Sequence, residues 1–302
     1  MNESDLLAHI YTRSRDLAAR FPHILVGPGH DCAAISLPGA ALLKVDQLIE
    51  SRHFSPGTPL NLIARKAIAR PLSDIAASGG SPLAALAAAT LPHNYPHADE
   101  LFDSLSRWAV RFNCPLVGGD IAASDSSPLA LSITLIGAPH PVRGPVLRSG
   151  ARPGDSLYIT GSIGASFDPA TGRGHHLTFD PRLPESRWLC DTLGPDLHAM
   201  MDISDGLGRD AGRMALASGV RIRLDAAAIP LSPGAADPLR AASQGEDYEL
   251  LFATSSPLPP ACPASGVPFT RIGTIEHGSG CTIKTGSQER DAGAMGWDHG
   301  RD

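Results

Sequence analysis

The segment ADELFDSLSRWAVRFNCPLVGGD, residues 98–120, contains the pattern that decides the fold. Residues 98–112 place apolar side chains at helical spacing, and residues 115–117 form a short apolar run that is typical of a strand. Gly118 and Gly119 then lead to Asp120. A helix followed closely by a strand, with a carboxylate at the strand's end, indicates a domain in which helices pack on a sheet.

Strand and helix patterns are mixed along the rest of the chain, which predicts an α/β or mixed α+β protein. The helical stretch at 59–78 contains Pro71, where we expect a break. Residues 83–91 fit either a strand or a buried helix, because an alanine-rich run does not distinguish the two. Further helices are expected at 4–17 and from Gly206 to Met214, the latter ended by Gly219, and strands at 41–45, 129–136, 221–224, 248–253 and 269–275.

Length and composition indicate a globular protein of two domains. The chain has 302 residues, 42% hydrophobic and 19% charged, and proline and glycine cluster between residues 139 and 154. We therefore predict domains at 1–143 and 144–302. The formal net charge of −6 argues against nucleic acid or an anionic membrane surface as a partner.

The cysteines and the N-terminus indicate a cytoplasmic protein. The 5 cysteines are scattered and form no CxxC pair, so neither a disulfide framework nor a zinc ribbon is expected. The first residues lack the basic and apolar regions of a signal peptide. The least charged stretch, 75–92, is too interrupted and too rich in alanine to span a membrane.

Isolated aspartates lie at the ends of short apolar runs, most of them within two residues of glycine or serine. Taken singly, each is most simply a turn residue or a helix cap. If the strands converge, the carboxylates converge too, and such a group of charges requires cations between them. The set is Asp31, Asp46, Asp74, Asp120, Asp202 and Asp205.

Oxygen ligands without a histidine or cysteine cluster point to Mg²⁺ or Mn²⁺ rather than zinc. Because magnesium commonly shares its coordination between carboxylates and substrate phosphates, the pattern predicts a phosphate-handling site. The sequence contains no GxxxxGK[ST] loop, no protein-kinase HRD or DFG motif and no GxSxG elbow.

Taken together, the motifs resemble the thiamine-monophosphate kinase family. They occur in the family's order, span residues from about 27 to 299, and include SDIAA and GEDYEL, which separate this family from aminoimidazole ribonucleotide synthetase and its other relatives. The matching segments are GHDCA (29–33), VDQLIE (45–50), HF (53–54), RKA (65–67), LSDIAA (72–77), GGD (118–120), RSGARPGD (148–155), MDISDGL (201–207) and GEDYEL (245–250).

The resemblance implies a two-domain fold like that of aminoimidazole ribonucleotide synthetase. Its N-terminal α/β domain would dimerise through its sheet, and its C-terminal α/β domain would complete the cleft. The implied reaction is in-line transfer of a phosphoryl group from ATP to thiamine monophosphate, giving thiamine diphosphate, with several Mg²⁺ ions. A homodimer is the expected assembly.

The resemblance also assigns roles to individual residues. The six aspartates named above would bind metal, and Asp74, Asp120 and Arg148 would serve catalysis. Gly119, Asp120, Arg148 and Ser204 would contact ATP, while His53, Glu246 and Trp297 would contact the thiamine phosphate. Without the motif, Glu246 would simply begin a strand and Trp297 would be a loosely packed terminal anchor. His175 and His176 are interpreted as loop residues.

Three positions depart from the family's pattern. His30 stands where the family has a metal-binding aspartate, and Lys44 and Val45 replace a pair of hydroxyl residues before Asp46. Lys44, one of only three lysines, either points inward and takes a metal ion's place beside phosphate, or points outward from an edge strand. Because of these changes, a second hypothesis is that the protein carries out the same ATP chemistry on a different phosphorylated acceptor. A third hypothesis is that the protein is a catalytically silent paralogue that binds nucleotide, and the retained aspartates argue against it.

Overall fold

A computed structural model describes residues 3–28, 33–37 and 39–297. The chain divides into two compact units. The first consists of Met1–Ile75, Ser81–Ala138 and Thr171–Arg173, and the second of Ala76–Gly80, Pro139–Ala170 and Gly174–Asp302. Each unit contains its own sheet, and the predicted mixed α/β class is confirmed.

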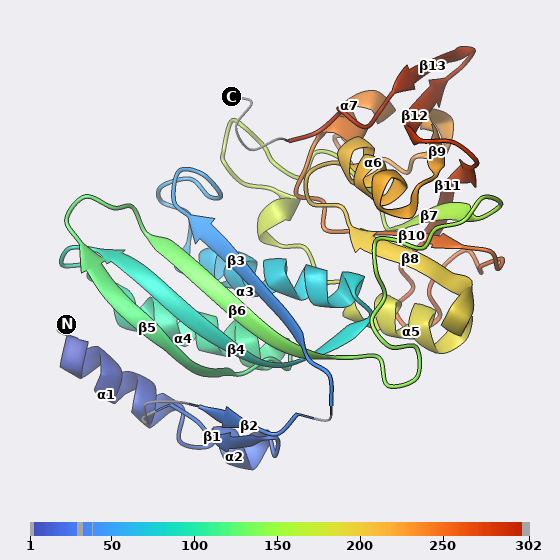
Figure 1. Ribbon diagram of the computed structural model, residues 1–302. Coiled ribbons are helices and arrows are strands. Elements are labelled where there is room, and N and C mark those ends of the chain that lie inside the picture. The colour runs from blue at the N-terminus through green and yellow to red at the C-terminus, as the bar shows by residue number, and fades with distance from the viewer. Residues whose placement is uncertain (1–2, 29–32, 38, 298–302) are drawn as a thin grey trace. The chain divides into compact units, whose positions relative to one another are not determined.

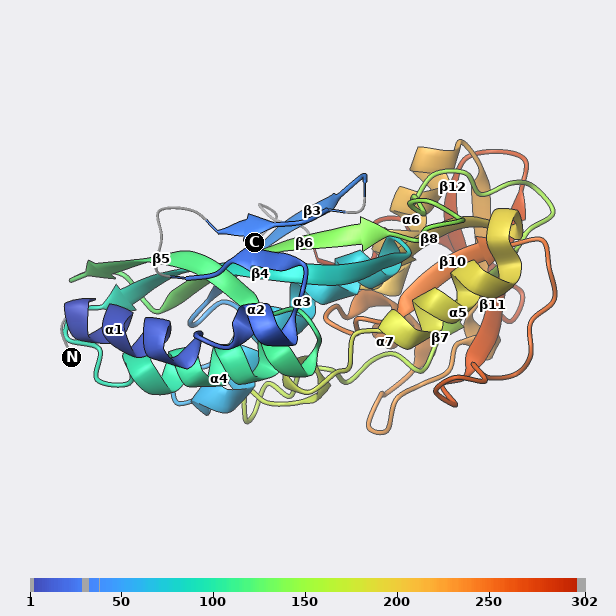
Figure 2. The same cartoon turned by 90° about the horizontal axis from the view of Figure 1, so that it is seen from below.

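The first unit is built on a four-stranded sheet of order β3-β6-β4-β5. β3 runs antiparallel to β6, whereas β4 and β5 are parallel. Two long helices, α3 and α4, cover one face of this sheet (Figures 1 and 2). The elements are α1 (Glu3–Arg13), α2 (Leu17–Arg20), β1 (Ile24–Val26), β2 (Ala34–Ile35), β3 (Leu42–Ile49), α3 (Leu60–Ala77), β4 (Gly80–Pro92), α4 (Ala98–Arg111), β5 (Leu116–Ser124) and β6 (Ala130–Pro139).

Three expectations for this unit need correction or completion. The predicted first helix is two helices, α1 and α2, and β4 shows that the alanine-rich run is a strand. The predicted break at Pro71 is wrong, because α3 continues through it. Pro71 cannot donate the helical hydrogen bond, but its neighbours Ile68, Leu72 and Ile75 are buried, and this packing holds the helix together.

Register fixes which side chains of β3 face the helices. Directly opposed residues point to the same face of a sheet, and Lys44 and Asp46 lie opposite Leu135 and Ile133 of β6, which are fully buried. The alternate residues Leu43 and Val45 lie on the other face and are 74% and 58% exposed. In the middle of β3, the charged Lys44 and Asp46 therefore face the helices, on the same side as the buried Leu48, whereas Leu43 and Val45 face away from them.

The second unit has a seven-stranded sheet of order β13-β12-β9-β11-β7-β10-β8 with helices on both faces. Every residue of β10 is buried: Leu251 and Ala253 pack in the cluster with α6, and Leu250 and Phe252 in the cluster with α5. The elements are β7 (Ser156–Thr160), η1 (His175–Leu177), α5 (Leu183–Leu193), η2 (Gly194–Asp196), β8 (Leu197–Asp202), α6 (Leu207–Ser218), β9 (Arg221–Asp225), η3 (Ala226–Ala228), α7 (Pro238–Ser243), β10 (Leu250–Thr254), β11 (Phe269–Glu276), β12 (Gly280–Thr285) and β13 (Gln288–Asp291).

The connection from β8 to α6 carries part of the predicted site. β8 ends at Asp202, and α6 begins at Leu207. The helix ends where predicted, at Gly219, whose φ of 67° is the left-handed conformation that glycine adopts without a steric penalty. Among the helices that the structure describes, none is long and apolar enough to cross a membrane.

Candidate active site

Lys44 bridges two of the predicted aspartates in the first unit. Its Nζ lies 2.9 Å from Oδ2 of Asp74 and 3.4 Å from Oδ1 of Asp46. The side chains of Lys44, Asp46 and Asp74 are 31%, 20% and 30% exposed, so the cluster is partly shielded but reachable from solvent. Of the two orientations that the sequence left open for Lys44, the structure shows the inward one, even though β3 is an edge strand of the sheet.

Strand alternation and the position of α3 together explain why Lys44, Asp46 and Asp74 meet. Lys44 and Asp46 are two residues apart on β3 and share a face. Asp74 lies in the last turns of α3, on the helix that covers this face of the sheet. The ammonium and the two carboxylates together sum to a formal charge of −1.

His53 is fixed just beyond the end of β3. Its Nδ1 accepts a hydrogen bond from the backbone N–H of Ile49 at 2.9 Å, and its carbonyl accepts one from Nζ of Lys66 at 2.7 Å. Lys66 on α3 is fully buried. Sequence reasoning gave Lys66 no role of its own, although the scarcity of lysine was a signal that could have drawn attention to it.

Gly119 and Asp120 lie within β5 rather than after it. The strand predicted at 115–117 is too short, because β5 continues to Ser124 and pairs in parallel with β4 along the way. A Cβ on Gly119 would lie 1.9 Å from the carbonyl oxygen of Ala87, so a side chain cannot fit there. The glycine thus lets β5 pass close to β4 and present the exposed Asp120.

In the second unit, a buried carboxylate holds the loop between β8 and α6. Asp210 accepts hydrogen bonds from the backbone N–H groups of Ser204 and Asp205 at 3.1 and 3.0 Å. Burial raises the pKa of Asp210 to about 6, and the Asp205 charge adds to this, against the lowering effect of Arg213 and the backbone hydrogen bonds. Asp210 thereby fixes the positions of Ser204 and Asp205.

Asp202 and Asp205 have different surroundings. Asp202 is buried at the end of β8. Asp205 is more exposed, and its Oδ2 accepts from Nη1 of Arg213 at 2.5 Å. Arg213 also bonds Asp210 at 2.8 Å, so one guanidinium connects the half-buried carboxylate of Asp205 with the fully buried one of Asp210.

Glu246 and Trp297 are both attached to this same loop by their backbones. The N–H of Glu246 donates to the carbonyl of Ser204 at 2.8 Å, and the N–H of Trp297 donates to the carbonyl of Asp205 at 2.8 Å. Trp297 is 38% exposed. The structure therefore brings together predicted residues from three separate parts of the sequence: Ser204 and Asp205, Glu246, and Trp297.

The Glu246 carboxylate is held by a histidine that sequence reasoning interpreted as a loop residue. His176 lies in η1, its side chain is fully buried, and its Nδ1 is 3.2 Å from Oε2 of Glu246. The Tyr248 hydroxyl lies 3.5 Å from Oε1. No local signal marked His176, because its partner is distant in the sequence.

Arg148 is exposed on the segment that precedes β7. Its carbonyl accepts from the Ser218 hydroxyl at 3.4 Å, and the same hydroxyl accepts from the N–H of Ala151 at 3.2 Å. The end of α6 thus fixes the backbone of the Arg148 segment.

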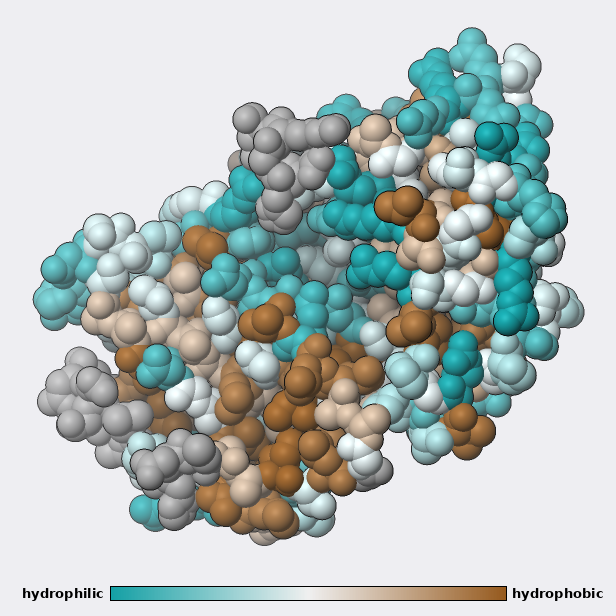
Figure 3. Space-filling model, viewed as in Figure 1, coloured by the Kyte–Doolittle hydropathy of each residue, from teal (hydrophilic) through white to brown (hydrophobic). Residues whose placement is uncertain are grey.

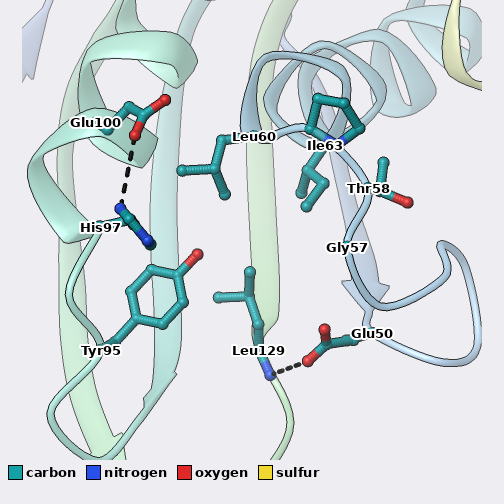
Figure 4. A pocket seen from close by; sticks show the side chains of 10 residues that line it. Glu50, Gly57, Thr58, Leu60, Ile63, Tyr95, His97, Glu100 and Leu129 are labelled. Carbon is teal, nitrogen blue, oxygen red and sulfur yellow. Dashed lines mark hydrogen bonds and ion pairs between the residues drawn. The ribbon is translucent and has the colours of Figure 1, made fainter.

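A separate cavity of about 360 Å³ lies in the first unit and contains none of the predicted site residues (Figure 4). Leu60, Ile63 and Leu129 supply apolar walls, and Glu50 and Tyr95 supply polar groups. Burial, together with the charges of Glu50 and Glu100, raises the pKa of the Tyr95 hydroxyl.

His30 and Asp31 lie outside the described residues. Within the described ranges, no group of three or more histidine, cysteine, aspartate or glutamate side chains is arranged to hold a metal ion. The carboxylates instead occur as a pair bridged by Lys44, as the Asp202–Asp205 loop and as the single Asp120.

Comparison with known proteins identifies the family. Residues 29–138 match the N-terminal domain, and residues 152–285 the C-terminal domain, of the family described as AIR synthase related protein. The thiamine-monophosphate kinase of Rhodopirellula baltica is 33% identical over 90% of this chain and 89% of its own length. The chain belongs to the thiamine-monophosphate kinase family.

Solved structures agree with this family membership. The thiamine-monophosphate kinase of Stenotrophomonas maltophilia K279a superimposes with a TM-score of 0.77 and 27% identity, covering 91% of this chain and 96% of its own. AaThiL, solved in complex with AMPPCP and TMP, superimposes with a TM-score of 0.68 and 26% identity over 96% of this chain and 98% of its own. The family predicted from the motifs is confirmed.

Proposed function

We propose that this protein phosphorylates thiamine monophosphate with ATP to give thiamine diphosphate, as the names of its relatives indicate. The observation that carries the proposal is the loop from Asp202 to Gly206, which holds two carboxylates and anchors both Glu246 and Trp297. One short segment would thereby carry two metal-binding carboxylates and hold two groups that recognise the substrate.

The chemistry places modest demands on proton transfer. The acceptor is a phosphate oxygen, and because the second pKa of a phosphate monoester is about 6, this oxygen is already ionised near neutral pH. A general base is therefore unnecessary. The work of the protein is to bring two anionic groups together and align them, which positive charge and positioning accomplish.

Asp120, Asp202 and Asp205 are the residues that we propose to hold magnesium. Carboxylate oxygens are the donors that Mg²⁺ prefers, and Asp202 and Asp205 flank one tight loop fixed by Asp210. Bound Mg²⁺ would neutralise charge on the phosphates. A cation bridging Asp46 and Asp74 fits less well, because the ammonium of Lys44 already contacts one oxygen of each.

Arg148, Gly119 and Ser204 are the proposed ATP contacts. Arg148 is exposed and carries a planar guanidinium suited to phosphate oxygens. Gly119 is exposed on β5 beside Asp120, where its backbone would meet a ligand.

Glu246, Trp297 and His53 are the proposed contacts to the thiamine phosphate. A carboxylate and an exposed indole attached to neighbouring backbone positions fit a cationic heteroaromatic ring, which pairs with the charge and stacks on the ring face. His176 holds the carboxylate in place from behind.

We further propose a homodimer formed through the open face of the first unit's sheet. α3 and α4 cover the other face, and Leu43 and Val45 of β3 are among the exposed large hydrophobic residues. Figure 3 views the uncovered side of the sheet, where apolar residues gather. Apolar surface of this kind is commonly covered by a partner.

The cytoplasm is the proposed location. Cys114, Cys190, Cys262 and Cys281 are free and buried, which fits a reducing compartment.

The test is an ADP-release assay with ATP, Mg²⁺ and thiamine monophosphate, run beside other phosphorylated acceptors. We expect turnover with thiamine monophosphate, and a large loss of turnover in a folded Asp74→Asn variant. Asp125→Asn makes the same change at an 87% exposed position of the same unit and should retain activity. Near wild-type turnover of Asp74→Asn, turnover only with another acceptor, or ATP binding without turnover would each contradict the proposal.

A further inference from the structure

We propose that the Lys44 ammonium takes the place of a divalent cation between Asp46 and Asp74, so that this protein binds one Mg²⁺ fewer than a site with a neutral residue at this position. The inference deepens the proposed function, because it concerns the cations of the same phosphate-handling site.

The contacts come from geometry that the fold determines. β3 alternation turns Lys44 and Asp46 to one face, and α3 brings Asp74 against that face. Nζ is 2.9 Å from Asp74 Oδ2, within the range of a charge-assisted hydrogen bond, and 3.4 Å from Asp46 Oδ1. The ammonium thus lies between the two oxygens that a bridging cation would need.

Electrostatics make a second cation at this position unfavourable. Two carboxylates and one ammonium sum to −1, whereas the two carboxylates alone would carry −2. A divalent ion placed between the same oxygens would meet the lysine's positive charge at contact distance, in a partly shielded environment where such repulsion is strong.

A tethered charge differs from a bound ion in one measurable way. Lysine is a compact point charge that is covalently attached to the chain, so its presence does not depend on the magnesium concentration. Removing it without supplying another charge should open a binding position for one divalent ion.

The test counts Mn²⁺ ions bound per chain in the presence of AMPPCP, by electron paramagnetic resonance of the free ion. Lys44→Ser and Lys44→Met remove the charge, with and without a ligand oxygen, and each should bind one ion more than the wild type. Lys44→Arg keeps the charge and should bind the wild-type number. Lys284→Ser removes a lysine from an exposed position on β12 and is the matched control.

Equal ion counts in the wild type and both neutral variants would overturn the proposal. If a neutral variant folds only when Mn²⁺ is added, the added ion has replaced the missing ammonium, which supports it. A neutral variant that stays unfolded at saturating Mn²⁺ counts against it. The count requires no turnover, so a wild type without kinase activity would refute the proposed function and leave this result standing.

Discussion

Asp247 should make the stability of the second unit fall as the pH rises from mildly acidic to mildly basic. Its Oδ1 accepts from the Gly164 N–H at 2.8 Å and from the Ser166 hydroxyl at 2.5 Å, while Oδ2 is buried with no hydrogen-bond partner in the described part of the chain. Burial, with further contributions from the charges of Glu249 and Asp210, raises the pKa of Asp247 to about 7. The carboxyl group is therefore protonated in the folded state at acidic pH.

The size of this loss of stability follows from the difference between the pKa of Asp247 in the folded protein and in the unfolded chain. The ordinary pKa is 3.8, so between this value and about 7 the folded protein holds a proton that the unfolded chain has released. Because the folded state binds more protons in this window, the free energy of unfolding decreases as the pH rises. Between about pH 5 and pH 8 the loss from this one group amounts to about 2–3 kcal/mol.

Asp247→Asn should remove this pH dependence while its amide oxygen keeps the contact with Gly164. The measurement is hydrogen exchange of the β10 peptides as a function of urea, which reports the opening free energy of this unit at each pH. Subtracting the variant from the wild type cancels the other titrating groups. Asp225→Asn, at an exposed position, should give a profile parallel to the wild type. A constant difference between wild type and Asp247→Asn across the range would refute the reasoning.

Three further changes probe packing, assembly and substrate binding. Gly119→Ala should destabilise the first unit by about 3 kcal/mol in urea unfolding, since its Cβ would collide with a backbone carbonyl, whereas Gly27→Ala, with open space around it, should be neutral. Val45→Glu should convert a dimer to monomer in light scattering, and an unchanged mass would exclude this face. His176→Phe should raise KM for thiamine monophosphate while KM for ATP stays unchanged, because Glu246 loses its support; equal effects on both would indicate a general structural defect.

Local signals were sufficient for several elements. The helix from Ala98, the glycine that ends α6 and the mixture of strands and helices all follow from short-range rules. The helical pattern around Pro71 was visible too, but the break expected there ignored how much surrounding burial can support a helix with one missing hydrogen bond. Tertiary packing, which the local sequence does not report, decided that case.

The residues of the candidate site also divide into those that local sequence predicted and those that it did not. Motifs identified the Asp202 loop and Glu246, but not the groups that hold them. Asp210 fixes the loop through backbone hydrogen bonds, and His176 reaches Glu246 from a 3-10 turn far away in the sequence. Supporting contacts of this kind depend on the folded arrangement, so no spacing rule could have found them.

β3 shows why orientation was harder to predict than secondary structure. Apolar and charged residues alternate at positions 43–46, which would ordinarily turn Leu43 and Val45 toward the helices. The structure has the opposite arrangement, with Lys44 and Asp46 facing α3, and Leu43 and Val45 exposed. This arrangement is stable only if the charges on the helix-facing side are paired with one another and the apolar side chains on the other face are covered by another surface. The Lys44 bridge supplies the first condition, and a second copy of the chain on the open sheet face would supply the other.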